Sequence, residues 1–177
     1  MHKNKAFLEL EGTPLVERSL AVLQTVFTEV LISSNEPELY AAYDVPVIQD
    51  GILGQGPLEG LYQGLKSMTN ECAFFVACDM PFLRAEVIHF LFTLFSKYDA
   101  VVPRLQSKLH PLHAFYHLRC LPSIKNSLEV GRLSILDLYP SLSVRYVEEI
   151  EMKAFPNVSK VFCNVNTPDN WSAVLKG

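Results

Sequence analysis

The sequence predicts an α/β fold, a three-layer α/β/α sandwich with a mostly parallel sheet. Short apolar runs that suit buried strands alternate with segments of helical spacing over most of the chain, as in consecutive β-α-β units. The most apolar run, residues 74–78, carries no polar side chain, which is typical of a strand buried on both faces of a parallel sheet. Because the chain has 177 residues and no internal repeat or linker, we expect one domain over residues 1–177.

Composition narrows the class of protein. Hydrophobic residues make up 49% of the chain and the mean hydropathy is +0.17, so a sizeable core is available. The net charge is −4 without any run of like charges, so we expect neither nucleic acid nor a membrane as partner. No signal peptide or membrane-spanning stretch is visible. No C-x-x-C pair occurs among the cysteines, which favours a reducing compartment and a cytoplasmic protein: Cys72, Cys78, Cys120 and Cys163.

Local signals place the elements of the first half. Thr13 before Pro14 indicates a helix start, an N-cap followed by proline at the first helical position, and apolar residues near helical spacing carry this helix to residue 27. We then expect a buried strand at residues 29–33, a short helix ending at residue 42 and a third apolar segment at residues 45–50. Residues 51–60 are the most glycine-rich part of the chain and open a helix that runs to residue 66 or 67.

The second half continues the alternation. Pro81 has no N–H for a sheet ladder, so the strand at residues 74–78 ends near Asp79. Gly131 is the expected stop of a helix at residues 121–129, since glycine suits the left-handed position after a helix. The other expected elements are a helix at residues 85–95, strands at 99–103 and 110–116, a helix at 135–138, a strand at 143–148, a last strand from 161 that passes into a loop by 168, and a helix from 169.

Several polar residues share one topological position, the carboxyl end of a buried strand: Asn35, Asp50, Asp79 and Asn166. These ends line one edge of a parallel sheet, where open α/β sheets bind ligands, so the group together indicates a site. Asp79 ends the most apolar strand, and a carboxylate there suits a hard cation such as Mg²⁺. It suits capping of the next helix equally well, and the other three, taken singly, are more typical of caps and turns.

Two further features suit an anionic ligand. Gly56 and Gly60 flank a helix start, where the backbone can approach a ligand closely and the helix N-terminus attracts anions. An ordinary loop entering a helix would explain these glycines as well. Lys5 is a candidate phosphate ligand, but a lysine near a terminus is usually only solvated. His110 and His113 would share a face of a strand, yet they lack a third ligand, so we expect no zinc site.

Six short motifs in this order carry a resemblance to a known family. They resemble the molybdenum cofactor guanylyltransferases, which have the nucleotide-diphospho-sugar transferase fold with a Rossmann-like sheet. The resemblance covers essentially the whole chain, and the spacing of the Gly-Pro-Leu-x-Gly, Cys-Asp-Met-Pro and Asn-x-Asn-Thr-Pro elements is specific. The motifs are Asn4-Lys5-Ala6, Gly12-Thr13-Pro14-Leu15-Val16-Glu17, Gly56-Pro57-Leu58-Glu59-Gly60, Cys78-Asp79-Met80-Pro81-Phe82, His110-Pro111-Leu112 and Asn164-Val165-Asn166-Thr167-Pro168-Asp169.

The family opens with a strand and a glycine-rich phosphate loop, and the chain matches only the tail of this loop. Lys5 falls on the loop's lysine, whereas Asn4 stands in place of its aspartate. We therefore expect the first strand and most of the phosphate loop to be missing, and the sheet to show a gap or an exposed edge there, open to another copy of the chain. We also expect these residues alone to bind GTP poorly and to turn it over hardly at all.

The resemblance implies a Mg²⁺-dependent transfer of GMP from GTP to molybdopterin. By this resemblance Asp79 holds the metal, Lys5 neutralises charge, and Asn35, Asp50 and Gly60 contribute to the nucleotide pocket. Asn164 and Asn166 lie toward the pterin or the metal.

Two alternatives remain open. One is a related transferase that uses CTP, and the other is a non-catalytic nucleotide- or pterin-binding protein that hands cofactor to a partner. Other cofactor-biosynthesis proteins or molybdoenzymes are candidate partners, and we expect a monomer or a weak homo-oligomer.

Overall fold

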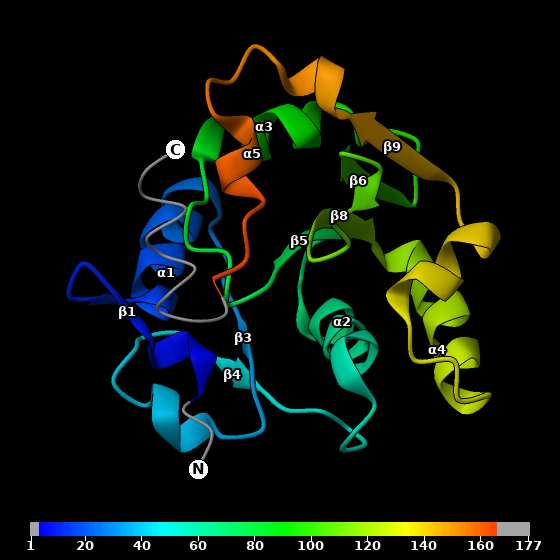
Figure 1. Cartoon of the computed structure of the whole chain (residues 1–177). Helices are drawn as coiled ribbons and strands as arrows, with labels where there is room; N and C mark the ends of the chain where they lie inside the picture. The colour runs from blue at the N-terminus through cyan, green and yellow to red at the C-terminus, as the bar shows by residue number, and fades with distance from the viewer. Residues whose placement is uncertain (1–3, 166–177) are drawn as a thin grey trace.

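Helices cover both faces of a central mixed sheet (Figure 1). The structure is a computed structural model, and it describes residues 4–165. The helices are α1 (Leu15–Val26), α2 (Gly56–Ser67), α3 (Ala85–Thr93), α4 (Leu121–Glu129) and α5 (Val158–Val161), with 3₁₀ turns at Lys5–Phe7, Pro37–Tyr40, Leu118–Cys120, Ile135–Ser141 and Glu149–Met152. The strands are β1 (Glu9–Leu10), β2 (Thr13–Pro14), β3 (Ile32–Ser33), β4 (Val47–Ile48), β5 (Cys72–Val76), β6 (Ala100–Leu105), β7 (Lys108–Leu109), β8 (His113–His117) and β9 (Val144–Glu148).

The main sheet has the strand order β5-β8-β6-β7, with β9 paired to the other edge of β6. β8 lies antiparallel between β5 and β6, and β9 is parallel to β6, so β5, β6 and β9 run in one direction. β3 and β4 form a separate parallel pair. Because β4 and β5 are joined through the single helix α2, a β-α-β crossover, β3 and β4 run in that same direction.

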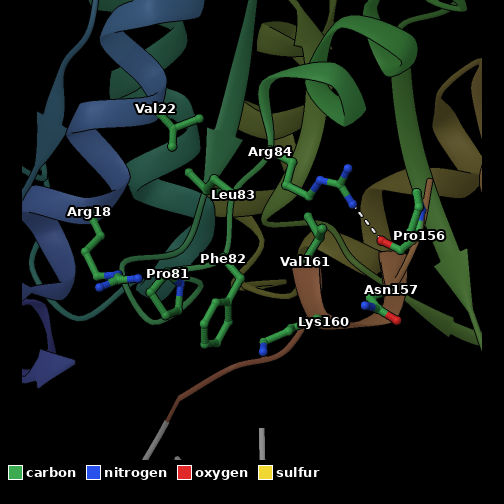
Figure 2. A pocket seen from close by; sticks show the side chains of 10 residues that line it. All are labelled: Arg18, Val22, Pro81, Phe82, Leu83, Arg84, Pro156, Asn157, Lys160 and Val161. Atoms are coloured by element: carbon green, nitrogen blue, oxygen red, sulfur yellow. Dashed lines mark hydrogen bonds between the residues drawn. The ribbon is translucent and has the colours of Figure 1, made fainter. Parts of the chain in front are cut away.

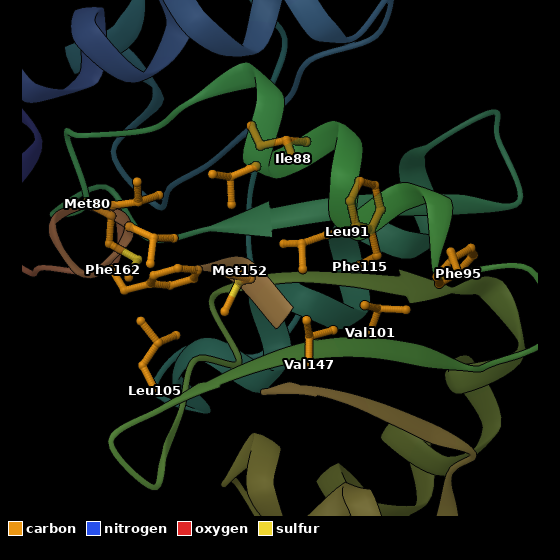
Figure 3. Close-up of a cluster of buried hydrophobic side chains, with 13 residues drawn as sticks. Met80, Ile88, Leu91, Phe95, Val101, Leu105, Phe115, Val147, Met152 and Phe162 are labelled. Atoms are coloured by element: carbon orange, nitrogen blue, oxygen red, sulfur yellow. The ribbon is translucent and has the colours of Figure 1, made fainter. Parts of the chain in front are cut away.

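Alternate residues of the central strands face opposite helical layers, which divides the core in two. Val101 of β6 and Phe115 of β8 pack with α3 and α5 in one cluster (Figure 3). Ala100 and Tyr116, each one residue away along its strand, pack with α2 and α4 in the other cluster. Burial on both faces confirms the predicted three-layer α/β sandwich.

Helix α2 lies across two strands that are not hydrogen-bonded to each other. A Cβ atom at Gly60 would come within 3.0 Å of Ser33 Oγ on β3, and one at Gly64 within 2.6 Å of the Phe75 ring on β5. The two glycines are one helical turn apart on the same face. β3 and β5 therefore belong to one layer beneath α2.

Several predicted boundaries agree closely with the structure. The predicted helix at residues 121–129 is α4, and Gly131 follows it with φ of +72°, the left-handed conformation that ends a helix at low cost in glycine. The glycine-rich segment opens α2 as predicted. No helix within residues 4–165 is long and apolar enough to cross a membrane.

The predicted cap at Thr13 is wrong. Thr13 and Pro14 form β2, which pairs antiparallel with β1, so their backbone groups serve a hairpin. Pro14 takes the N-cap position of α1 without a side-chain hydrogen bond. The turn between the strands has positive φ at Glu11 and Gly12, and this tight hairpin outcompetes the local capping signal.

The predicted strand at residue 161 is also wrong, since Val161 ends helix α5. The residues that follow, up to Val165, form no strand; the Val165 N–H donates to the Asp79 carbonyl oxygen at 2.7 Å. The Val165 side chain is buried with Leu10 and Leu15, so burial there comes from a crossing segment. The rest of this prediction and the helix from residue 169 lie outside the described residues.

Two strands are less buried than predicted. All five residues of β5 are only partly buried, and Cys78 beyond it is exposed, although this run had suggested burial on both faces. The strand expected at residues 29–33 is reduced to β3, which is partly buried at Ile32 and exposed at Ser33. Among the described strands, β5 pairs only with β8, so its other edge is unpaired.

Candidate functional site

Asp79 lies three residues beyond β5, at the carboxyl edge of the sheet, and is only 8% exposed. Its Oδ1 accepts a hydrogen bond from Asn164 Nδ2 at 3.0 Å. The neighbouring Val165 N–H binds the Asp79 carbonyl oxygen, so main chain and side chain are both tied to this C-terminal segment. The two motifs Cys-Asp-Met-Pro and Asn-x-Asn thus meet through direct hydrogen bonds.

Lys5 reaches the other oxygen of the same carboxylate. Its Nζ lies 3.8 Å from Asp79 Oδ2, with the lysine side chain 50% exposed. Asn4 fixes this position, since its Oδ1 caps the 3₁₀ turn by accepting from the Ala6 N–H at 3.2 Å, and Ala6 is buried. Lys5 is therefore placed beside Asp79 while its ammonium group keeps contact with solvent.

Asn35 and Asp50 form a second group at the ends of β3 and β4. Asn35 Nδ2 donates to Asp50 Oδ2 at 2.7 Å, and its Oδ1 accepts from the Asp50 N–H at 2.9 Å. The two contacts fix the carboxylate of Asp50 and leave its other oxygen available as an acceptor. Asn35 therefore holds the Asp50 side chain in place.

The glycine-rich loop is anchored by a residue that the sequence analysis did not single out. Glu59 on α2 is 2% exposed, and its Oε1 accepts from the Gly51 N–H and from Gln63 Nε2, both at 2.8 Å. Gly54 and Gly56 have positive φ, as the tight loop requires. An acidic residue in the first turn of a helix that follows a glycine loop was the available signal.

The direct contacts arrange the predicted residues in two groups. Lys5, Asp79 and Asn164 form one, and Asn35 with Asp50 the other. Gly60 packs against Ser33 at the end of β3. Asn166 lies outside the described residues. Asn4 links the two regions, because its Nδ2 donates to Glu36, just past β3, while Lys5 reaches Asp79 past β5.

The Asp79 group fits a divalent cation that a substrate helps to hold. Mg²⁺ commonly takes one or two carboxylates, water and substrate phosphate oxygens, and Asp79, held by the Asn164 amide nitrogen, offers such a carboxylate. Within residues 4–165, no cluster of three or more His, Cys, Asp or Glu side chains could hold a metal by itself. Burial lowers the pKa of His110 to about 4 and that of His113 to about 3, so both are neutral and apart from this chemistry.

A cavity of about 560 Å³ lies beside the turn that follows Asp79 (Figure 2). Arg18, Arg84 and Lys160 contribute positive charge to its wall. Arg84 is already engaged, by Glu86 and by the Pro156 carbonyl oxygen at 2.6 Å, and Lys160 lies over the Phe82 ring at 5.2 Å. The cavity therefore has less free charge than its composition suggests, and the Asp79 group is the stronger candidate for phosphate chemistry.

Comparisons with known proteins agree with this geometry. Residues 1–144 match the family described as MobA-like NTP transferase domain. A "Probable molybdenum cofactor guanylyltransferase" of Pelotomaculum thermopropionicum is 35% identical over 96% of this chain and 83% of its own length. A "Molybdenum cofactor guanylyltransferase" of Desulfosudis oleivorans is 34% identical over 94% and 83%.

A solved structure shows the same fold. The molybdopterin-guanine dinucleotide biosynthesis protein A of Archaeoglobus fulgidus superposes with a TM-score of 0.86 at 24% identity, covering 99% of this chain and 90% of that one. The family match over residues 1–144 includes Lys5 and Asp79, and the relatives match over nearly the whole chain. This chain belongs to the molybdenum cofactor guanylyltransferase family, a family of nucleotidyltransferases within the MobA-like NTP transferases.

Proposed function

We propose that the chain transfers GMP from GTP to molybdopterin with the help of Mg²⁺. The observation that carries this proposal is the convergence of Lys5, Asp79 and Asn164 at the carboxyl end of β5. A buried carboxylate held by an amide and faced by a lysine suits phosphoryl chemistry, in which positioning and charge neutralisation do most of the work. The assignment of guanine as the base and of molybdopterin as the acceptor rests on family membership.

In this reaction an oxygen of the terminal phosphate of molybdopterin attacks the α-phosphorus of GTP. The bond between the α-phosphorus and the oxygen that bridges to the β-phosphate breaks, and pyrophosphate leaves with that electron pair. Mg²⁺ supplies charge neutralisation on the phosphates when it is bound. Asp79 would hold the cation, Asn164 would fix the carboxylate orientation, and Lys5 would offset negative charge on the leaving group.

The second group suits recognition of the base. The carboxylate of Asp50, positioned by Asn35, would accept hydrogen bonds from the N1–H and N2–H₂ edge of guanine. Gly60 would allow close approach of the nucleoside, since it has no side chain beside Ser33. Asn166 is proposed for the pterin side on its motif alone.

Replacement of Asp79 by Asn tests the metal assignment. The amide keeps an acceptor for Asn164 but loses the charge, so we expect Mg²⁺-dependent release of pyrophosphate to fall by about 10²-fold or more. The matched control is Asp44→Asn, which removes the same charge at an exposed position. Turnover of GTP with molybdopterin is measured for both, in the printed chain and in a form extended at its N-terminus, and thermal unfolding checks that both variants stay folded.

The same assay separates the alternatives. Dinucleotide formed from GTP supports the proposal, whereas preferential transfer from CTP would indicate the related cytidylyl reaction. Nucleotide binding without any transfer in either form of the chain would indicate the non-catalytic binding protein. Wild-type turnover by the Asp79→Asn variant would show that the metal is held elsewhere.

A further inference from the structure

Strand β9 forms one edge of the main sheet. It pairs in parallel with β6, and no other strand among residues 4–165 pairs with it. The Ala100 N–H of β6 donates to the Ser143 carbonyl oxygen at 3.4 Å. Because backbone groups alternate between the two sides of a strand, the odd-numbered residues 143–147 bond to β6. The even-numbered residues 144–148 therefore turn their N–H and carbonyl groups to the free edge.

Two side chains, Arg145 and Glu151, cover part of this free edge. The Arg145 guanidinium donates to the Tyr146 carbonyl oxygen and forms an ion pair with the Glu151 carboxylate. Glu151 Oε1 in turn accepts a hydrogen bond from the Glu148 N–H at 2.8 Å. One acceptor and one donor of the edge are thus already bonded within the chain. We call the Arg145–Glu151 pair with these two backbone contacts the edge clamp.

The edge clamp is charged and fixed in place. The hydrogen bond from Arg145 lowers the pKa of the Glu151 carboxyl, with the Glu148 N–H adding to the effect, so Glu151 is ionised at neutral pH. Arginine stays protonated in proteins. Glu151 belongs to the 3₁₀ turn Glu149–Met152, which follows β9 directly and is anchored by the fully buried Met152. The carboxylate is therefore held beside the edge by the backbone as well as by Arg145.

The residues of β9 suit pairing with a second copy of the same strand. Valine and tyrosine, which favour strands, predominate in it, and it has neither the proline nor the lysine that commonly protect an edge. In an antiparallel pair centred on Tyr146, Val144 of one copy would face Glu148 of the other, and Arg145 would face Val147. No like charges face each other in this two-fold symmetric pairing. The strand alone would therefore allow self-association.

We propose that the edge clamp keeps the β9 edge of this chain from pairing with the β9 edge of a second copy. Such a pair needs the Tyr146 carbonyl oxygen and the Glu148 N–H, and the clamp occupies both. Displacing it would leave a partly buried ion pair without its backbone partners, which is unfavourable. Because β9 and β5 lie at opposite edges of the main sheet, this inference does not depend on the proposed function.

Removal of the edge clamp tests the proposal. The clamp variant combines Arg145→Thr, which keeps a β-branched residue in the strand, with Glu151→Ala, so the net charge is unchanged. The matched control combines Lys125→Ala with Glu129→Ala, which removes an exposed ion pair on α4. Sedimentation velocity over a range of protein concentrations measures self-association. We expect the dimer of the clamp variant to have a dissociation constant about tenfold lower, or less, than that of the wild-type chain or the control.

A third substitution locates the association at β9. The Val144 N–H turns to the free edge, so Val144→Pro removes a donor that β6 does not use. Added to the clamp variant, it should restore the weak association of the wild-type chain. Association of the clamp variant no stronger than that of the wild-type chain would overturn the proposal. Association that survives Val144→Pro, or that the Lys125 and Glu129 control shares, would overturn it as well.

Hydrogen exchange of the wild-type chain tests the edge clamp even if the clamp variant does not fold. The Glu148 amide donates to Glu151, whereas the Val144 and Tyr146 amides turn to the free edge. We expect the Glu148 amide to be protected about tenfold more than the other two, at every protein concentration. Equal protection of the three amides would overturn the proposal. Protection of the Tyr146 amide that rises with concentration would also overturn it, since the wild-type edge would then pair despite the clamp.

Discussion

His113 shows how a single residue couples stability to pH. It is fully buried between the rings of Phe74 and Phe162, at centroid distances of 5.0 and 4.5 Å. Neither ring nitrogen has a hydrogen-bond partner among the described residues. Burial, with His110 nearby, lowers the pKa of His113 to about 3. The side chain therefore behaves as an apolar core residue at neutral pH.

The sign of the resulting pH dependence follows from proton binding. Between pH 6.5 and about 3 the unfolded chain holds a proton on this histidine that the folded chain does not, so stability falls as the pH is lowered through this window. From pH 7 to pH 5 we expect a loss of about 2 kcal/mol from His113. His113→Leu should remove this loss and cost less than about 1.5 kcal/mol at pH 7. Urea unfolding at both pH values measures the free energy of unfolding, and replacement of the exposed His89 by Gln is the control. If stability depends on pH in His113→Leu as strongly as in the wild-type chain, the prediction is wrong.

Asp50 carries the prediction on base choice. If its carboxylate accepts from the guanine edge, adenine or cytosine would leave the contact unmade, which costs about 1–3 kcal/mol. We expect GTP to compete better than ATP and CTP in binding, and Asp50→Asn to reduce this preference by about tenfold. Asp44→Asn again serves as the control of equal charge. Equal affinities of the three nucleotides for the wild-type chain would remove the guanine assignment.

At the scale of elements, the contact between α2 and β5 depends on the absence of a side chain. A Cβ at Gly64 would lie 2.6 Å from Phe75 Cε1, and that ring is held edge-on to Tyr116 at 5.9 Å. We expect Gly64→Ala to destabilise the fold by about 1–3 kcal/mol through overpacking, despite the better helix propensity of alanine. Adding Phe75→Leu to Gly64→Ala should recover part of the loss if the clash is its cause. Thermal unfolding of the single and double variants measures the coupling, and additive effects would argue against it.

Side-chain hydrogen bonds at the carboxyl edge hold the site residues together where the elements are short. Asn4 caps a three-residue 3₁₀ turn, which places Lys5, and Glu59 ties the glycine loop to α2. β3 and β4 have only two residues each, yet Asn35 and Asp50 join their ends by two hydrogen bonds. Side-chain hydrogen bonds between loops therefore fix the positions of these residues where the strands are too short to do so.

At the scale of the whole molecule, the groups that the described residues offer to a triphosphate bear on nucleotide affinity. Lys5 is the cation that the described site places beside Asp79, and triphosphates are usually held by several backbone N–H groups in a loop after a strand. Hydrogen bonds to charged oxygens contribute about 1.5–3 kcal/mol each, so the lack of two or three would weaken binding by several orders of magnitude. We expect the printed chain to bind GTP with Mg²⁺ poorly in calorimetric titration. Micromolar binding by the printed chain would refute this.

The sequence by itself determined the layered α/β class, most of the helices and the choice of candidate site residues. Helix α4 and its stop at Gly131 could be predicted because the glycine signal acts within a few residues. The polar residues at strand ends could be predicted because a buried strand appears in the sequence as an apolar run, and the first polar residue after the run marks its end. The family motifs added Lys5 and Asn164.

Only the tertiary structure decided how these parts meet. Thr13 lies in a hairpin and Val161 ends a helix, since each outcome depends on contacts with other segments of the chain. The role of Glu59 depends on Gly51 lying eight residues away, across a loop whose path sequence spacing does not set. Backbone pairing and burial are properties of the assembled layers, which is why local signals predicted the elements and the assembled fold decided their contacts.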